Sequence, residues 1–554
     1  MRNLPFIESL ERRSLLSGVT IITHGQGGDA RDDEIELAAN LVAQRAGGAS
    51  QYIMTVEQEG VGAKVTSFVR DAGSADPNMT ANGEIVIKLD YSDVSKFPMS
   101  IVGRAVADYL LADASVTGHR LVEQELAMVG PSRGGPVISE IAGNLARRGV
   151  WVDHLVFLDP VPIPFVDPDL VLTDNVIFAD DYWRDDGNLL NEDFDGRPID
   201  GAHNVELKVV QEHHTIGAHP SVAAYYLATI DPNMPLVAPA RSEWFMSPWP
   251  ARNETGFAFS RIAGGQRPAD GVARSHGGTG SRVAVKRNST QWANVDDLRL
   301  LGGNFTVPAG QWLRVSMRME DMDSRSTVSL YLDQDTNPYN NNTVSRLDRR
   351  SFAARGVAPV KLAGSTVEAS PGTYHVYAQI RDNGGHARYS YLQGTITLRA
   401  PNASDLFASL SNGALVATGT AGNDRIFATS DGVNVNITRG DFTQRFAASS
   451  VTSITLDTGA GDDFLVLGDN MPAATLIGGA GRDVLVGGAG DDLLSGGANK
   501  DRLFGLGGND RLVAGGGNDI LTGGAGADTL SGGAGRDTGD NDSTDTRISI
   551  DVLG

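Results

Sequence analysis

A serine between two glycines forms the most specific reactive pattern in the chain: residues 130–134 read GPSRG and match G-x-S-x-G. Glycines allow a turn sharp enough to lift the serine hydroxyl clear of a sheet, where it can attack a carbonyl carbon. The apolar run at 126–129 predicts a strand before the turn, and the pattern at 136–148 predicts a helix after it. This setting makes Ser132 a candidate nucleophile, and a purely structural turn is the alternative.

A glycine-rich segment near the start of the chain could supply the second part of such a site. Residues 19–23 form a β-rich run that leads into 24–28, which read HGQGG. A loop of this kind brings a backbone N–H group to the oxygen that becomes negative during attack on a carbonyl. The predicted donors are the N–H groups of Gln26 and Arg133, and a plain strand-to-helix loop is the alternative.

A serine is a poor nucleophile without a base, and a histidine should therefore follow it. Three histidines, His213, His214 and His219, cluster just past the β-like run at 205–210. His219 directly precedes a predicted helix at 221–230 and is the first candidate for the base. His214 is the second candidate, and an ordinary surface histidine is the alternative for each.

The third group of a catalytic triad should be a carboxylate between the serine and the histidine in chain order. Asp159 follows the predicted strand at 152–158, and Asp180 follows the predicted strand at 176–179. Either side chain could orient the imidazole and stabilise its charged form. The other one would be a turn former at the end of a strand.

Strand-like and helix-like patterns alternate through residues 18–232, which predicts a mainly parallel sheet covered by helices on both faces. In the order oxyanion loop, serine, aspartate and histidine, this segment resembles the α/β-hydrolase fold, and lipase-like members most closely. Several lipases carry the Leu-Asp-Pro found at 158–160, which favours Asp159. Pro131 stands where lipases commonly have histidine, and a minimal core without earlier strands is expected.

The resemblance implies a serine hydrolase that acts on carboxylic esters, among them lipids. Ser132 would attack the carbonyl, His219 would carry the proton, and Asp159 or Asp180 would orient the histidine. Peptidase and thioesterase chemistry use the same triad and stay open. A fold does not establish an activity, so a non-catalytic surface or adhesion protein with a hydrolase-like scaffold is the alternative.

A second pattern, near the C-terminus, points to metal binding. Segments such as GGAGRDVLV repeat every nine residues and follow the nonapeptide G-G-x-G-x-D-x-U-x. Each unit offers a carboxylate and glycine turns, which suit Ca²⁺, and one leucine, which only stacking can bury. A disordered Gly/Asp-rich tail is the alternative. The repeated aspartates are Asp483, Asp492, Asp501, Asp510, Asp519, Asp528 and Asp537.

This stretch resembles the RTX calcium-binding β-roll, which implies that the seven aspartates are calcium ligands. We place the β-roll at 403–554, because weaker repeats at 419–427 and 458–466 precede the regular ones. Metal binding should be coupled to folding, because stacked carboxylates would otherwise repel one another. The calcium requirement favours an extracellular or cell-surface protein.

The remaining segments complete a multidomain chain. Residues 1–17 contain LERRSLL, which looks like the LEPR-XLL motif of exported bacterial proteins, with Arg12 in place of proline. A short amphipathic helix without a targeting role is the alternative. Residues 233–290 are rich in Gly, Pro, Ser and Arg, which predicts a linker or an irregular extension. Short β-like runs at 291–400 predict a β-sandwich.

The composition limits the classes of partner and binding site that the chain can have. A net charge of −22 argues against nucleic acid, because phosphate binding needs clustered lysine and arginine. No apolar run approaches the length of a bilayer span. The absence of cysteine excludes disulfides and thiolate metal sites.

Overall fold

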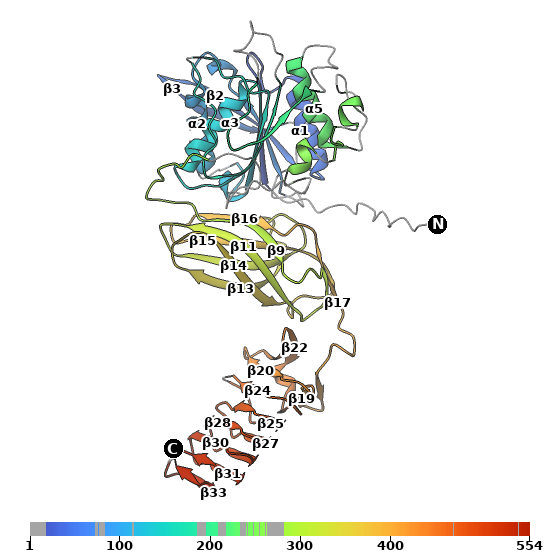
Figure 1. Ribbon diagram of the computed structural model, residues 1–554, viewed down its shortest axis with the longest axis vertical. Coiled ribbons are helices and arrows are strands. Elements are labelled where there is room, and N and C mark those ends of the chain that lie inside the picture. Colours follow the sequence, from blue (N-terminus) through green and yellow to red (C-terminus); the bar gives the residue numbers. More distant parts are fainter. Residues whose placement is uncertain are drawn as a thin grey trace, which may run out of the picture. The chain divides into compact units, whose positions relative to one another are not determined.

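The computed structural model describes residues 18–71, 76, 83–112, 116–164, 166–184, 196–208, 218–232, 282–468, 470–540 and 542–553, with short pieces between 236 and 262. The chain splits into two compact units (Figure 1). The first comprises Met1–Gly303, Val315–Leu362 and Tyr374–Ile396, and the second comprises Asn304–Arg314, Ala363–Thr373 and Thr397–Gly554. The expectation of a multidomain, strand-rich chain is therefore confirmed.

An eight-stranded sheet forms the centre of the first unit, in the order β3-β2-β4-β1-β5-β6-β7-β8. All neighbouring strands are parallel except the β2–β3 pair at one edge. The carboxyl ends of β1, β5 and β6 therefore meet along one edge of the sheet. The strands are β1 (Gly18–Thr23), β2 (Ser50–Glu59), β3 (Gly62–Arg70), β4 (Ile85–Asp90), β5 (Glu125–Pro131), β6 (Val152–Leu158), β7 (Val176–Trp183) and β8 (His203–Glu206).

Helices cover both faces of this sheet, as the alternation of strand and helix patterns predicts (Figure 1). One apolar core contains side chains of α2 and α3 and the other contains side chains of α1 and α5. The helices are α1 (Asp33–Arg45), α2 (Met99–Leu111), α3 (Gly134–Ala146) and α5 (Ala218–Ile230), with 3₁₀ turns at Ser92–Val94, Leu121–Glu123, Ser242–Phe245 and Gly256–Phe259.

Three details of the sheet differ from the sequence-based expectations. The hairpin of β2 and β3 was not predicted. Strand β7 continues to Trp183, so Asp180 lies inside the strand and does not end it. Strand β8 begins at His203, earlier than the predicted run at 205–210, whose last two residues lie outside the described part.

Two further sheets, with most of their residues in the first unit, are formed by strands from 291–400, where the sequence predicts a β-sandwich. One sheet pairs β12 with β13 and β15, and β15 with β16, while the other has the order β14-β11-β9. The buried Arg388 donates to the Asp153 carboxylate, and Trp151 Nε1 donates to Glu320 Oε2 at 2.6 Å. The sandwich thus packs against the amino end of β6, away from the edge that carries Ser132. Its strands are β9 (Asn294–Leu300), β11 (Trp312–Asp321), β12 (Ser326–Asp333), β13 (Thr343–Phe352), β14 (Arg355–Ser365), β15 (Gly372–Asp382) and β16 (Ala387–Tyr391).

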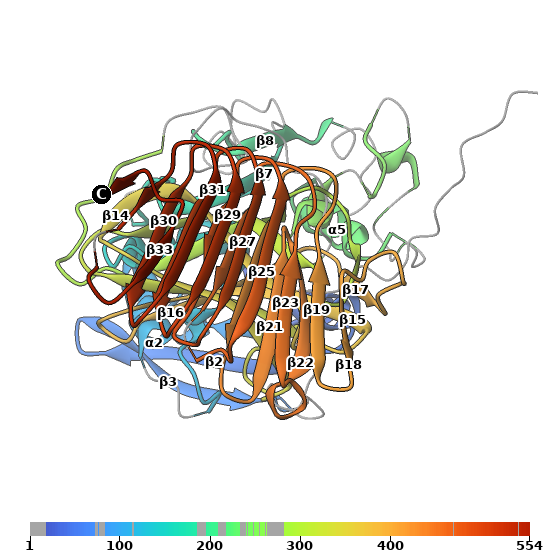
Figure 2. The same ribbon diagram turned by 90° about the horizontal axis from the view of Figure 1, so that it is seen from below.

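The second unit is dominated by a roll of two mainly parallel sheets, one of which is seen in Figure 2 as strands lying side by side. Each strand pairs with the one eighteen residues further along in the regular repeats, as Leu494 does with Leu512. One leucine per repeat is fully buried, which confirms the predicted inward position: Leu485, Leu494, Leu503, Leu512, Leu521 and Leu530.

The strands of the second unit are β10 (Thr306–Pro308), β17 (Ile396–Arg399), β18 (Ala408–Ser411), β19 (Ala414–Thr418), β20 (Arg425–Ser430), β21 (Asn434–Arg439), β22 (Phe442–Ala447), β23 (Ser453–Asp457), β24 (Phe464–Leu467), β25 (Ala474–Ala480), β26 (Val484–Val486), β27 (Leu493–Ala498), β28 (Arg502–Gly507), β29 (Arg511–Gly516), β30 (Ile520–Ala525), β31 (Thr529–Ala534), β32 (Thr538–Gly539), β33 (Thr546–Ile548) and β34 (Val552–Leu553). The 3₁₀ turn Ala448–Ser450 follows β22. Across the described residues, no helix is long and apolar enough to cross a membrane.

Candidate functional site

Ser132 occupies the turn between β5 and α3 in a left-handed conformation, with φ at 51°. A non-glycine residue pays about 1–2 kcal/mol for this conformation, so its surroundings must enforce it. Ser132 N–H donates to the Leu158 carbonyl at 2.9 Å, and the Ser132 carbonyl accepts from Gly135 at 3.0 Å and Val161 at 3.2 Å. These bonds fix the backbone of the turn while the side chain stays half-buried.

Glycines around the turn leave no room for side chains. A Cβ on Gly130 would lie 2.5 Å from the Gly134 carbonyl oxygen, and one on Gly134 would lie 2.0 Å from Thr23 Oγ1. A Cβ on Gly25 would lie 3.3 Å from Ser132 Cβ. The loop after β1 therefore passes directly over the serine, as the sequence predicted for the two glycine-rich segments.

His24 fixes the start of that loop. Its ring stacks on Tyr91 at 3.9 Å, its Nε2 accepts the Tyr91 N–H at 3.2 Å, and its Nδ1 donates to the Gly25 carbonyl at 2.7 Å. Burial lowers the pKa of His24, so the ring is neutral and Nδ1 carries the proton. Neither the Gln26 nor the Arg133 backbone N–H donates to any described residue, and both can receive an external acceptor.

The Arg133 side chain anchors the turn to two other loops. Its guanidinium is buried and makes paired hydrogen bonds of 2.8 and 2.9 Å to Asp167, and it also donates to the carbonyls of Ser95 and Phe97. Asp167 in turn accepts the Ile163 N–H at 2.9 Å. Sequence analysis missed Asp167, because no spacing connects it to a residue 34 positions earlier.

Asp159 lies one strand away from Ser132, since Pro131 and Leu158 are register partners at the ends of β5 and β6. It is fully buried with φ at 48°. Its carboxylate accepts Arg184 Nε at 2.6 Å and the Gly196 N–H at 3.1 Å.

Asp180 lies deeper in the sheet, level with Val156 in the middle of β6. Its oxygens pair with His154 Nε2 at 2.9 Å and His203 Nδ1 at 3.1 Å. The structure therefore brings Asp159, but not Asp180, to the edge that carries Ser132.

The predicted base is only partly described. His219 lies in the first turn of α5, and its side chain is outside the described part of the chain. His213 and His214 lie entirely outside the described residues, as do residues 1–17 with their LEPR-XLL-like motif.

The nonapeptide aspartates form a second candidate site, in the turns of the roll. All seven are at most 3% exposed. One oxygen of each accepts a backbone N–H from the preceding coil, as Asp501 Oδ1 does from Asp483 at 2.8 Å. The other oxygen of Asp483, Asp501, Asp510, Asp519, Asp528 and Asp537 has no partner among the described residues, whereas that of Asp492 accepts the Gly488 N–H at 2.7 Å.

The first glycine of most repeats opens space around this unpartnered oxygen. A Cβ on Gly478 would lie 2.5 Å from Asp483 Oδ2, and one on Gly505 would lie 2.2 Å from Asp510 Oδ2. Burial raises the pKa of Asp501 to about 7 and that of Asp483 to about 6. A buried carboxylate without a partner is costly, and a bound divalent cation removes that cost.

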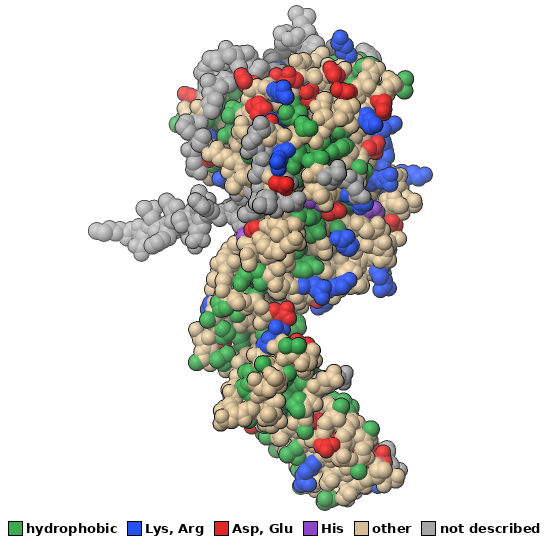
Figure 3. Space-filling view, turned by 180° about the vertical axis from the view of Figure 1, so that it is seen from behind, with side chains coloured by type: hydrophobic (Ala, Val, Ile, Leu, Met, Phe, Trp, Pro, Cys, Tyr) green, Lys and Arg blue, Asp and Glu red, His purple; other side chains and the backbone are tan. Residues whose placement is uncertain are grey.

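The donor chemistry fits Ca²⁺, which prefers oxygen ligands. No three acidic or histidine side chains converge on one point among the described residues, so carbonyl oxygens of the glycine turns must complete each coordination shell. The aspartates are also mostly hidden from the surface, and the face of the repeats in Figure 3 shows few acidic side chains.

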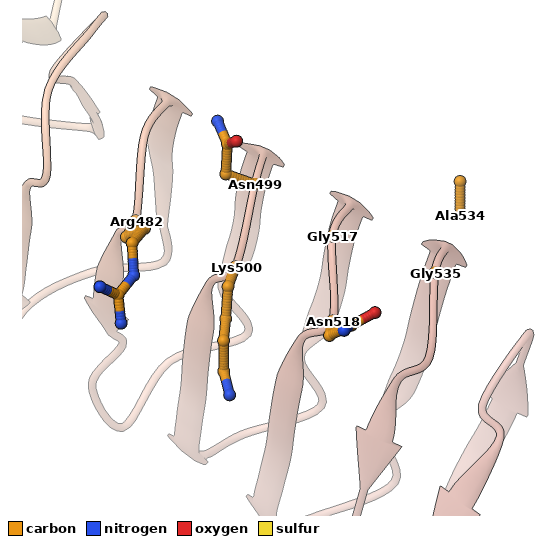
Figure 4. Close-up of a pocket in the computed structure, with 7 residues that line it drawn as sticks. All are labelled: Arg482, Asn499, Lys500, Gly517, Asn518, Ala534 and Gly535. Carbon is orange, nitrogen blue, oxygen red and sulfur yellow. The ribbon is translucent and has the colours of Figure 1, made fainter.

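The outer edge of the turns carries a different set of residues. Arg482 and Lys500, eighteen residues apart, extend from successive coils beside Asn499 and Asn518 around a shallow, open depression (Figure 4). Both cations are exposed, whereas the aspartates that follow them are buried. In each of these turns a solvated cation and an inward-facing carboxylate thus belong to consecutive residues.

The C-terminal fold and its aspartates define a β-roll of nonapeptide repeats. The sequence profile of the RTX calcium-binding nonapeptide repeat (four copies) matches residues 477–512 and 504–538. These are RTX repeats, and they bind calcium, as the sequence predicted.

None of the curated proteins matches this chain. The CARDB domain of a Pyrococcus furiosus protein, solved in complex with two metal ions, is 8% identical. This likeness covers 20% of this chain and 94% of that chain with a TM-score of 0.14, and no argument rests on it.

Proposed function

We propose that the chain is an exported serine hydrolase that cleaves carboxylic esters, carried beside a calcium-stabilised RTX roll. One observation carries the proposal: Ser132 sits in a left-handed turn between a central strand and a helix, under the glycine loop that follows the adjacent strand. This arrangement matches the nucleophile elbow and oxyanion loop of α/β-hydrolases. It favours that fold for residues 18–232.

In the proposed mechanism Ser132 Oγ attacks the ester carbonyl while His219 takes its proton. The N–H groups of Gln26 and Arg133 hold the resulting oxyanion, for which they are suitably unengaged. Collapse of the tetrahedral intermediate expels the alcohol, which receives the proton from His219, and leaves an acyl-serine ester. Water then attacks that ester by the same route and restores the serine.

Asp159 is the proposed partner of His219, and its position at the strand end next to Ser132 supports it over Asp180. Peptidase and thioesterase activities would use the same groups and are distinguished by substrate alone.

A fluorophosphonate probe tests the proposal, because it labels only serines activated by a base. We expect the calcium-loaded protein to be labelled, and Ser132→Ala to lose the label with an unchanged circular dichroism spectrum. Ser139→Ala is the matched control, because Ser139 lies on α3 and donates to the Val171 carbonyl. A folded protein that takes no label would remove the proposal.

One observation favours the second candidate, a non-catalytic calcium-binding surface protein. The Asp159 carboxylate already forms an ion pair with the buried Arg184 guanidinium, which competes with an imidazole for the same oxygens. If neither the wild-type protein nor Arg184→Gln is labelled, a non-catalytic surface protein is favoured.

Location outside the cell is also a proposal. It rests on the calcium requirement of the roll and on the LEPR-XLL-like sequence at 10–16. Deletion of residues 1–17 should retain the protein inside the producing cell, and unchanged release would refute an export role for this segment.

A further inference from the structure

A narrow apolar crevice runs between α1, α5 and the sheet in the first unit. Ile35 and Ala38 of α1 line one wall, and Ala223 and Leu227 of α5 line the other. Its remaining walls are almost entirely apolar, with the carboxylate of Glu34 at an exposed position where α1 begins. A crevice without polar walls binds water poorly and favours apolar groups.

The crevice adjoins the proposed site. Pro131, the residue before the candidate nucleophile, lines it together with Leu158, whose carbonyl accepts the Ser132 N–H at 2.9 Å. Ala223 lies one helical turn beyond His219 on α5. The crevice therefore lies beside the backbone of the turn that carries Ser132.

The volume of the crevice limits the size of the acyl group that it can bind. The cavity volume is about 30 Å³, or room for about two to three waters, which corresponds to about two to three methylene groups beyond the carbonyl carbon. A six-carbon ring, which needs a cavity of about 150 Å³, does not fit. Each buried methylene should raise kcat/KM about fourfold until the crevice is full.

We propose that this crevice binds the acyl chain, and that the preferred substrates are esters of short carboxylic acids rather than long-chain lipids. The inference rests on the proposed function and adds the substrate class to it. The specificity-determining residues are Leu227 and Ala223, which line the crevice from α5 with a large and a small side chain.

The test compares kcat/KM for p-nitrophenyl esters of two to twelve carbons. Wild type should prefer chains of about three to four carbons. Leu227→Ala should move the optimum up by two or more carbons, and Ala223→Leu should move it down toward acetate. Leu41→Ala is the matched control, because Leu41 is half-buried in the same core but does not line the crevice.

Fluorophosphonate labelling of every variant separates two kinds of failure. Variants that are labelled but keep the wild-type chain-length profile overturn the crevice as acyl site and leave the hydrolase proposal intact. If wild type itself takes no label, the hydrolase proposal fails and the inference fails with it. Labelled variants with opposite shifts in the optimum establish the inference.

Discussion

Buried aspartates behave differently in the two units of the molecule. In the first unit, Asp159 and Asp167 each accept both an arginine guanidinium and a backbone N–H. In the second unit, Asp501 and its counterparts other than Asp492 use one oxygen for a backbone N–H, and the other has no partner among the described residues. The first set is neutralised by the chain itself, whereas the second needs an ion that the chain does not supply.

The proposed catalytic groups and the calcium-binding groups are therefore stabilised in different ways. The groups around Ser132 can be held in place by internal hydrogen bonds, and we expect the site to form without metal. The roll stores unpaired negative charge in its turns, and we expect its folding to depend on Ca²⁺. The following predictions are ordered from the largest expected effect to the smallest.

Removal of calcium should unfold the roll and leave the sheet of the first unit folded. Each bound ion contributes about 3–4 kcal/mol when its concentration is 100 to 1000 times its Kd, so the loss of several ions exceeds the stability of an ordinary domain. Trypsin with mass spectrometry reports this directly, because Arg482, Lys500, Arg502 and Arg511 lie within the repeats. Cleavage that is equally slow with EGTA and with calcium would contradict the contrast.

Asp167→Asn should destabilise the first unit by about 3–5 kcal/mol, because it leaves the buried Arg133 guanidinium without its charged partner. The loss should be the same with calcium and with EGTA, as measured by the urea midpoint of tryptophan fluorescence. Asp169→Asn, at an exposed position two residues further on, should change little. A calcium-dependent effect of Asp167→Asn would break the separation between the two units.

Leu506→Gly should stabilise the calcium-loaded roll by about 1 kcal/mol, because Leu506 is held at φ 76° while its side chain is half exposed. Gly515→Leu, at the corresponding position of the next repeat, should do the opposite. A Cβ there would lie 2.1 Å from the Gly497 carbonyl oxygen. Calcium titrations followed by circular dichroism should show midpoints shifted in opposite directions, and equal shifts would refute this account of the turns.

Lower pH should partly replace calcium in the roll. Burial raises the pKa of Asp501 to about 7 and that of Asp510 to about 6, above the ordinary carboxyl value. The folded, metal-free roll therefore binds more protons than the unfolded chain between about pH 4 and 7, and its stability falls as pH rises through this window. We expect more metal-free structure at pH 5 than at pH 8, and tighter calcium binding at pH 8. A metal-free roll that gains structure on raising the pH would contradict the sign.

The nine-residue period made the roll predictable from the sequence. A nine-residue phase places every aspartate in a turn and every leucine in the core, and both placements are confirmed. The sharp turn at Ser132 and the glycine loop beside it were also predictable, because glycine spacing indicates where backbones must approach closely. The roles of Ser132, His219 and Asp159 stay predictions.

Features that depend on contacts between residues far apart in the sequence could not be predicted. Asp180 resembles a strand terminator, but His154 and His203 on the neighbouring strands allow it to be buried inside β7. The polar alternation of β2 and β3 belongs to a hairpin at the sheet edge, where one face stays solvated. The Arg133–Asp167 pair joins loops that no local pattern connects.

The most direct test of the account is fluorophosphonate labelling of the full chain with calcium and with EGTA, read by mass spectrometry of the peptide that contains Ser132. We predict equal labelling of this serine in both conditions, while trypsin cuts the repeats only in EGTA. Absence of label on Ser132 in the folded, calcium-loaded protein would contradict the account.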